Sequence, residues 1–254
     1  MNPLSNTFKF VGLAAVVLGA GAFSPSLIAK EYVSQINATE VIELFTSEGC
    51  SSCPPADRWL TTLKDRPETF TSLIPMAFHV DYWDYIGWKD RFAKPAYGLR
   101  QRQYVSTGNV SQAYTPQMVT NSNEWRGFLS GQLEWKANND KPGVLKATLQ
   151  DPAENMVIHF SPQGVLKPKH YVLNVAVLGM GLSSRVTAGE NHDRTLQHDF
   201  VVLSHDKKTV AVSPSRWEVK KPLVPNMGQT QSAIAVWLSV PDSQKIIQAT
   251  GGYL

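Results

Sequence analysis

A single pair of cysteines constrains this chain more than any other feature. Cys50 and Cys53 are its only cysteines, and two serines separate them. A short apolar segment typical of a buried strand, residues 40–46, precedes the pair, and Pro54 and Pro55 suit the first turn of a following helix. The helical pattern places four apolar side chains on one face: Ala56, Trp59, Leu60 and Leu63. A helix N-terminus stabilises a nearby thiolate, so a cysteine pair at such a turn favours thiol–disulfide chemistry.

The N-terminus resembles a secretory signal. Lys9 precedes the uncharged apolar run 10–28, and Ala22 and Ala29 each end a small-residue cleavage sequence. This pattern predicts a signal peptide in residues 1–29, and therefore a periplasmic or secreted mature chain without stable membrane insertion. An uncleaved membrane anchor is the alternative, although glycines and a proline interrupt the run.

Export changes what the cysteines are expected to do. In an oxidising compartment two thiols this close pair as a disulfide. So small a loop stabilises the fold little, which favours a chemical role over a merely structural one. Such a role requires an accessible Cys50 sulfur. Glu43, in the preceding strand, would have a raised pKa near the dithiol and could accept a proton from the deeper sulfur; alternatively it faces solvent or pairs with a cation.

The next segments are expected to surround the cysteines. Residues 72–80 predict a second strand, and residues 81–90 form an aromatic and acidic loop that either walls the dithiol or caps the core. A helix is expected over residues 91–105, and another, shorter one over residues 125–133. Between them, the Thr115–Pro116 bond opens a short strand, where proline requires an edge or a cis turn. We expect it to be cis and to lie opposite the cysteine helix.

Several of these stretches carry a family resemblance. They are residues 46–57, 78–84, 87–90 and 114–117, with 189–191, 194–196 and His198 in the second half. Together they resemble the exported bacterial family catalogued as domain of unknown function 1223, which has a thioredoxin-like fold. The resemblance implies an α/β thioredoxin-like domain over residues 38–136.

By further analogy with thioredoxins, the resemblance also implies roles for individual residues. Cys50 would be the attacking sulfur, Cys53 the resolving sulfur and Pro116 the cis-proline beside Thr115. The serine pair between the cysteines departs from the Gly-Pro of thioredoxin itself.

From about residue 137 the pattern changes to short strands separated by turns. This predicts a β-rich, sandwich-like domain over residues 140–254. Within it, residues 200–203 and 209–212 are expected to be separate strands joined by a turn at 205–208. The polar segment 189–199 matches no standard metal-ligand spacing, so we expect a hydrogen-bonded connection and predict neither metal nor cofactor.

These features together indicate an exported thiol–disulfide oxidoreductase acting on protein or peptide thiols and disulfides. The net charge is only +3 and the basic residues are spread along the chain, so nucleic acid is not an expected partner. One alternative is a copper or soft-metal binding protein, with Met76, Met118 or His79 completing a thiolate site. Another is a redox-inert thioredoxin-like binding protein.

Overall fold

The computed structural model describes residues 1, 28–151, 154–164 and 168–254. The predicted signal peptide, residues 1–29, therefore lies almost wholly outside the described residues. Within the described part of the chain, none of the helices has the length and apolar character needed to cross a bilayer.

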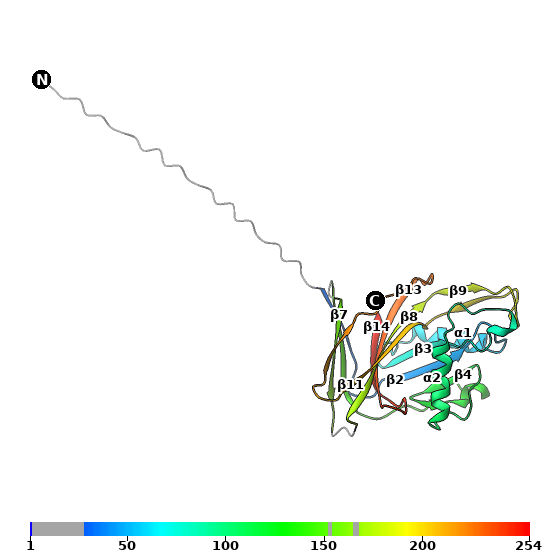
Figure 1. Ribbon diagram of the computed structural model, residues 1–254, viewed down its shortest axis with the longest axis horizontal. Helices are drawn as coiled ribbons and strands as arrows, with labels where there is room; N and C mark the ends of the chain where they lie inside the picture. Colours follow the sequence, from blue (N-terminus) through cyan, green and yellow to red (C-terminus); the bar gives the residue numbers. More distant parts are fainter. Residues whose placement is uncertain (2–27, 152–153, 165–167) are drawn as a thin grey trace.

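The protein is mostly β-sheet (Figure 1). Its strands are β1 (Ile28–Val33), β2 (Glu40–Thr46), β3 (Leu73–His79), β4 (Gln117–Thr120), β5 (Asn123–Glu124), β6 (Gly143–Asp151), β7 (Asn155–Pro162), β8 (His170–Met180), β9 (Leu182–Arg185), β10 (Thr195–His198), β11 (Val201–Ala211), β12 (Arg216–Lys220), β13 (Gln231–Ser239) and β14 (Ile246–Tyr253). Its helices are α1 (Pro54–Thr62) and α2 (Pro95–Ser106), with 3₁₀ turns at Leu63–Asp65, Asp84–Ile86 and Arg126–Ser130.

One large sheet runs through both halves of the sequence. Its strand order is β14-β13-β8-β11-β3-β2-β4-β5. The two halves meet where β11 pairs in parallel with β3, through Val201 opposite Ala77. The expected β-rich second half is present, but its central strands extend the sheet of the first half. The predicted boundary near residues 137–142 stays a prediction.

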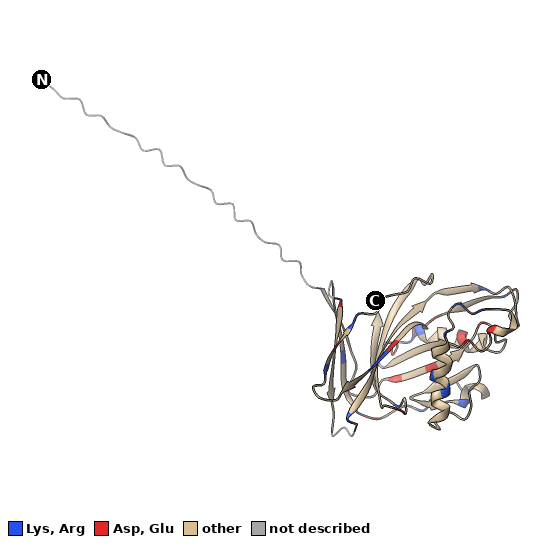
Figure 2. Cartoon of the chain, viewed as in Figure 1, with Lys and Arg blue, Asp and Glu red and all other residues tan. Residues whose placement is uncertain are grey.

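The second half of the large sheet is covered by a smaller sheet of order β1-β6-β7-β12. Alternation along β13 shows the layering: Ile234, Val236 and Leu238 belong to the core between the two sheets, while Ala233 and Trp237 belong to the core under the helices. Because successive side chains point to opposite faces of a strand, β13 is buried on both sides. Charged residues are scattered over the ribbon without gathering on one element (Figure 2).

Some predicted elements differ from the observed ones. The prediction of a turn at residues 205–208 is wrong. Strand β11 continues through these residues, because it pairs antiparallel with β8 from Gly179 to His170. The helix expected from residue 91 begins at Pro95, a residue suited to a first helical turn. The helix expected over residues 125–133 is a 3₁₀ turn at Arg126–Ser130.

Candidate functional site

The two cysteines form a disulfide at the start of α1. Cys53 directly precedes the helix, and the two Cα atoms are 5.5 Å apart. Cys50 is 1% exposed and Cys53 is fully buried. The expectation of an accessible Cys50 sulfur is therefore wrong for this state, although Ser51 and Ser52 between the cysteines are exposed.

A segment from the second half of the chain covers the disulfide loop. We call residues 189–194 the covering segment. Its fully buried Asn191 donates from Nδ2 to the carbonyl oxygens of Glu48 and Cys50, at 2.9 Å each. Glu190 Oε2 accepts a hydrogen bond from the Ser51 N–H at 2.9 Å, which lowers the pKa of Glu190. The segment is thus the hydrogen-bonded connection that the sequence predicted, and it faces the first half of the chain.

Thr115 and Pro116 lie at the same end of β2 as the cysteine loop. Strand β4 pairs with β2 through Gln117 opposite Phe45, so the two preceding residues reach the end from which the loop leaves. The Thr115–Pro116 bond is cis, as predicted. Trp83, in the aromatic loop, donates from Nε1 to Thr115 Oγ1 at 2.7 Å.

The aromatic loop also contacts the cysteine loop itself. A Cβ atom at Gly49 would lie 3.0 Å from Trp83 Cβ and 3.4 Å from Ile86 Cδ1, so the backbone approaches this closely only because residue 49 is glycine. Trp83 therefore lies between the Cys50 end of the loop and Thr115.

Glu43 does not belong to this site. Thr46 bonds Asp57 of α1, whereas Glu43, three positions earlier, accepts hydrogen bonds from Arg100 and Tyr104 of α2. Residues three apart in a strand point to opposite faces, so Glu43 points away from α1 and its cysteines. The predicted role of Glu43 as a proton acceptor for the cysteines is wrong. The alternative prediction, that Glu43 pairs with a cation, is confirmed.

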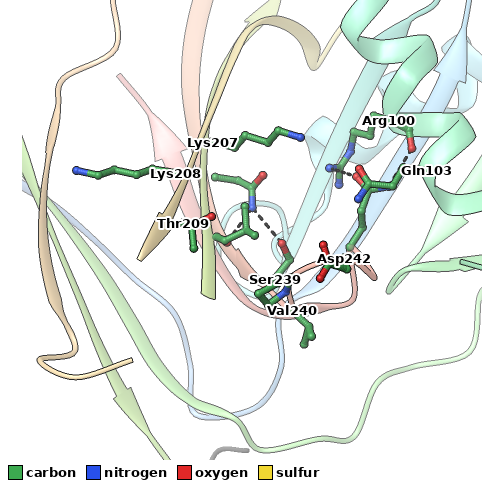
Figure 3. Close-up of a pocket in the computed structure, with 12 residues that line it drawn as sticks. Arg100, Gln103, Lys207, Lys208, Thr209, Ser239, Val240 and Asp242 are labelled. Carbon is green, nitrogen blue, oxygen red and sulfur yellow. Dashed lines mark hydrogen bonds between the residues drawn. The ribbon is translucent and has the colours of Figure 1, made fainter. Parts of the chain in front are cut away.

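Arg100 and Glu43 form a buried ion pair. Arg100 Nε and Nη2 lie 2.6 and 2.8 Å from the two Glu43 oxygens, and Arg100 Nη1 donates to Gln244 Oε1 at 2.8 Å. Burial alone would lower the pKa of Arg100, but Glu43 and Tyr104 outweigh it and raise that pKa. Arg100 also lines a pocket of about 290 Å³ between α2, β11 and the end of β13 (Figure 3).

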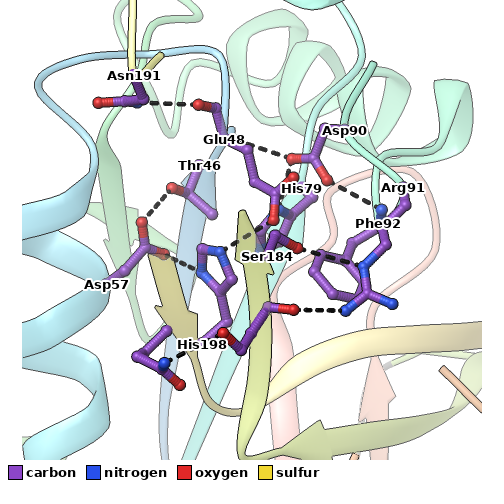
Figure 4. A network of polar contacts seen from close by, with 12 residues as sticks. Thr46, Glu48, Asp57, His79, Asp90, Arg91, Phe92, Ser184, Asn191 and His198 are labelled. Carbon is purple, nitrogen blue, oxygen red and sulfur yellow. Dashed lines mark hydrogen bonds and ion pairs between the residues drawn. The ribbon is translucent and has the colours of Figure 1, made fainter. Parts of the chain in front are cut away.

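A second polar network connects Glu48, just before the cysteines, with Asp57 and His198 (Figure 4). His198 Nε2 is 3.2 Å from Glu48 Oε1, and His198 Nδ1 is 3.9 Å from Asp57 Oδ1. Trp88 Nε1 donates to the other Glu48 oxygen at 2.9 Å. Both carboxylates and the imidazole are at most 6% exposed.

The network continues through a second histidine. His79 Nδ1 is 2.6 Å from Asp90 Oδ2, and both side chains are buried. Asp90 also accepts hydrogen bonds from the N–H groups of Glu48 and Phe92. The rings of His79 and His198 are 5.0 Å apart.

Two groups in the network have shifted pKa values. Burial alone would lower the pKa of His198, but the neighbouring carboxylates of Asp57 and Glu48 outweigh it and raise the pKa to about 10. Burial alone would raise the pKa of Asp90, but His79 and the two N–H donors lower it. In both cases a buried group is stabilised in its charged form by specific partners.

Sequence reasoning missed this network. It offered His79 as a residue that could complete a thiolate metal site, and it placed His198 in a connection between strands. No local pattern could reveal the network, because His198 comes 141 positions after Asp57 in the sequence. The two residues meet only because β10 packs on α1. Only the family resemblance placed Glu48, Asp57 and His198 in a common set of motifs.

Two solved structures resemble this fold. Protein AGR_C_4864 from Agrobacterium tumefaciens superposes with a TM-score of 0.59 at 21% identity, covering 85% of this chain and 95% of that one. HBP35 of Porphyromonas gingivalis gives a TM-score of 0.55 at 14% identity, covering 87% of this chain and 76% of that one. At these identities the likeness concerns the fold alone.

The sequence comparisons identify a family without an assigned activity. No curated protein matches the chain. A family model described as protein of unknown function (DUF1223) matches residues 41–239, which include both cysteines, the covering segment and the buried network. The chain belongs to this DUF1223 family.

Proposed function

We propose that this chain is an exported thiol–disulfide oxidoreductase that uses Cys50 and Cys53. One observation carries the proposal: the only two cysteines of the chain form a disulfide immediately before α1, where the helix N-terminus favours a thiolate. Its partners would be protein or peptide thiols and disulfides in the periplasm or outside the cell.

The arrangement around the cysteines supports a thioredoxin-like unit. Parallel strands β2 and β3 are joined through α1, and antiparallel β4 and β5 follow α2, giving the local order β3-β2-β4-β5. A Cys-x-x-Cys pair at such a β-α-β turn is typical of thioredoxin-like redox proteins.

The chemistry needs no other group. In the reduced protein, the Cys50 thiolate would attack a substrate disulfide, form a mixed disulfide and release one substrate thiolate. The Cys53 thiolate would then attack the Cys50 sulfur and release the second substrate thiolate. The cycle passes two electrons to the substrate and restores the Cys50–Cys53 disulfide; run in reverse, it oxidises a dithiol.

The covering segment would control access to this disulfide. Because Cys50 is buried, exchange requires local opening of the structure around it, and residues 189–194 form hydrogen bonds to the loop that carries it. Local opening of this kind is governed by the few contacts that hold a segment closed. Here these include the hydrogen bonds of Glu190 and Asn191.

Shortening Glu190 is expected to speed reduction of the disulfide. Glu190→Ala removes the acceptor of the Ser51 N–H, and with it one of the contacts that hold the segment closed, so the rate should rise a few-fold. The measurement is the rate of dithiothreitol reduction, followed by alkylation and mass. His192→Ala is the matched control, because its exposed side chain in the same segment pairs only with Asp193. Equal rates in both variants would contradict control by the segment.

The reduction potential of the couple tests the proposed function. Equilibration in glutathione buffers, followed by alkylation, should give a potential between about −120 and −270 mV, the range of thiol–disulfide oxidoreductases. The protein should also reduce or oxidise a model substrate, and Cys50→Ser should abolish this activity. A potential below about −300 mV, with no turnover of substrate, would contradict the proposal.

The burial of both sulfurs favours one alternative, a redox-inert binding protein. In that case the disulfide would stabilise the turn before α1, and the same measurement would return the very low potential. The copper alternative needs free thiolates, so it would apply only to the reduced chain.

A further inference from the structure

We propose that Asp57, His79 and His198 bind a divalent transition-metal ion, with Zn²⁺ the best match to their donor atoms. One donor atom from each of the three side chains lies within 4.8 Å of the other two, and all three residues are buried. This site uses nitrogen and oxygen donors on α1, β3 and β10, so it is separate from the disulfide and independent of the proposed redox function.

The unpartnered atoms of the network point to a ligand. His79 Nε2 and both nitrogens of His198 are buried without a hydrogen-bond partner that meets ordinary geometry. Buried polar atoms are nearly always partnered, so several orphaned nitrogens together need an explanation. A metal ion bound to one nitrogen of each ring supplies it.

Each of the three side chains has a second polar group on its far side. His79 Nδ1 bonds Asp90 Oδ2 at 2.6 Å, which leaves Nε2 as its free donor. His198 Nε2 is 3.2 Å from Glu48 Oε1, which leaves Nδ1 on the side of Asp57. Asp57 Oδ2 accepts from Thr46 Oγ1 at 2.9 Å, which leaves Oδ1.

This is the pattern of metal sites in proteins. Metal-bound histidines usually donate their other N–H to a carboxylate, which fixes the ring and its tautomer. Here His79 has such a hydrogen-bonded carboxylate in Asp90, the Glu48 carboxylate lies 3.2 Å from His198 Nε2, and the third ligand is itself a carboxylate (Figure 4). Two imidazoles and one carboxylate are a common zinc set, with a further position left for water or substrate.

The size of the site is close to what zinc needs. Three atoms no more than 4.8 Å apart place a central ion roughly 2.8 Å or less from each, and Zn–N and Zn–O bonds are about 2.0–2.2 Å. Side-chain movements of less than about 1 Å therefore complete the coordination.

The charge of the network also favours a cation. Glu48, Asp57 and Asp90 are three carboxylates with at most 6% exposure, and within the described part of the chain they form ion pairs only with the two imidazoles. Buried carboxylates need compensating positive charge. Zn²⁺ provides that positive charge.

A small pocket lies beside two of the three proposed ligands. A pocket of about 110 Å³ is lined by Asp57 and His198, together with Arg58 and Arg194. The pocket brings solvent up to two of the three proposed ligands. The two arginines would attract small anions to the same pocket.

The test is a direct measurement of metal binding. Purified protein is stripped with a chelator, titrated with Zn²⁺ against a chromophoric competitor and analysed for bound metal. We expect one equivalent of Zn²⁺ per chain, a Zn²⁺-dependent rise in melting temperature, and the visible spectrum of tetrahedral Co²⁺ when cobalt replaces zinc. Less than half an equivalent, with no change in melting temperature, would overturn the proposal.

Variants assign the ion to this site. Asp90→Asn keeps every ligand but weakens the support of His79, and should lower the affinity about 10–100-fold. His198→Gln removes a ligand and should lower it further, whereas exposed His170→Gln is the matched control and should bind normally. Circular dichroism checks the fold of each variant, and Asp90→Asn keeps the test valid where His198→Gln fails to fold.

The cysteines separate this site from a thiolate site. The double variant Cys50→Ser with Cys53→Ser should bind Zn²⁺ with unchanged stoichiometry and affinity. If it loses the metal, the ion belongs to the cysteine pair and the proposal fails. Because this variant lacks redox chemistry altogether, zinc binding by it also stands whether or not the proposed oxidoreductase function is correct.

Discussion

Replacing Arg100 with methionine is expected to destabilise the folded protein by about 3–5 kcal/mol. The substitution removes both charge-assisted hydrogen bonds to Glu43 and leaves a carboxylate that is 1% exposed without a cation. Tyr104 still donates to that carboxylate, but a neutral donor does not balance a buried charge. Urea denaturation followed by fluorescence, with the disulfide intact, measures the loss.

Two further variants show whether the unpaired charge is the cause. Arg102→Met, two residues away on the exposed side of α2, should change stability by less than about 0.5 kcal/mol. The double variant Glu43→Leu with Arg100→Met removes both charges and should recover most of the lost stability. If the double variant is as unstable as Arg100→Met, the loss comes from packing against Phe78, Tyr104 and Trp237, which the guanidinium also contacts.

The same pair shows what the sequence could predict. Its pattern predicted a buried strand over residues 40–46, and with it an ionisable group inside the protein. It could not choose between a role at the cysteines and an ion pair, because the partner lies 57 positions later on α2. The alternation of side chains along β2 shows which partner Glu43 meets only once α1 and α2 are known to lie on opposite faces of the sheet.

Local features were predictable and long-range pairings were not. The turn, the cysteines and the helix that follows them are encoded within about fifteen residues, and a proline at the start of a strand narrowed the Thr115–Pro116 bond to an edge position or a cis turn. By contrast, Val201 meets Ala77 through a pairing that no local pattern specifies. That pairing brings β10 and the covering segment onto α1, and so creates both the burial of Cys50 and the histidine network.

A second large effect is expected from acid. Burial, followed by the charges of Arg100, Lys207 and Lys94, lowers the pKa of His205 to about 3. The ring stacks on Trp237 with centroids 5.0 Å apart, contacts Phe78 edge-on, and has Nε2 3.0 Å from Asn174 Oδ1. The folded protein therefore holds a neutral imidazole among three cations from α2, its N-terminal flank and β11.

The direction of the pH effect follows from the two pKa values. In the unfolded chain His205 takes up a proton near pH 6.5, whereas in the folded protein it does so only near pH 3. Acid therefore favours unfolding: the stabilisation is complete above pH 6.5 and is lost as the pH falls toward 3. At pH 5 the loss should reach up to about 2 kcal/mol. Because part of the residue is exposed, this figure is an upper limit.

The window between pH 6.5 and pH 5 isolates this group. The raised pKa of His198 increases the free energy of unfolding as the pH falls toward 6.5, and this contribution stays constant at lower pH. The lowered pKa of Asp90 changes the free energy of unfolding only below about pH 4. His205→Phe keeps a ring against Trp237 but cannot be protonated, so its stability should be nearly constant across this window. Urea denaturation at half-unit pH steps measures both proteins under matched metal and redox conditions. An equal decline in His205→Phe would show that the acid sensitivity comes from another group.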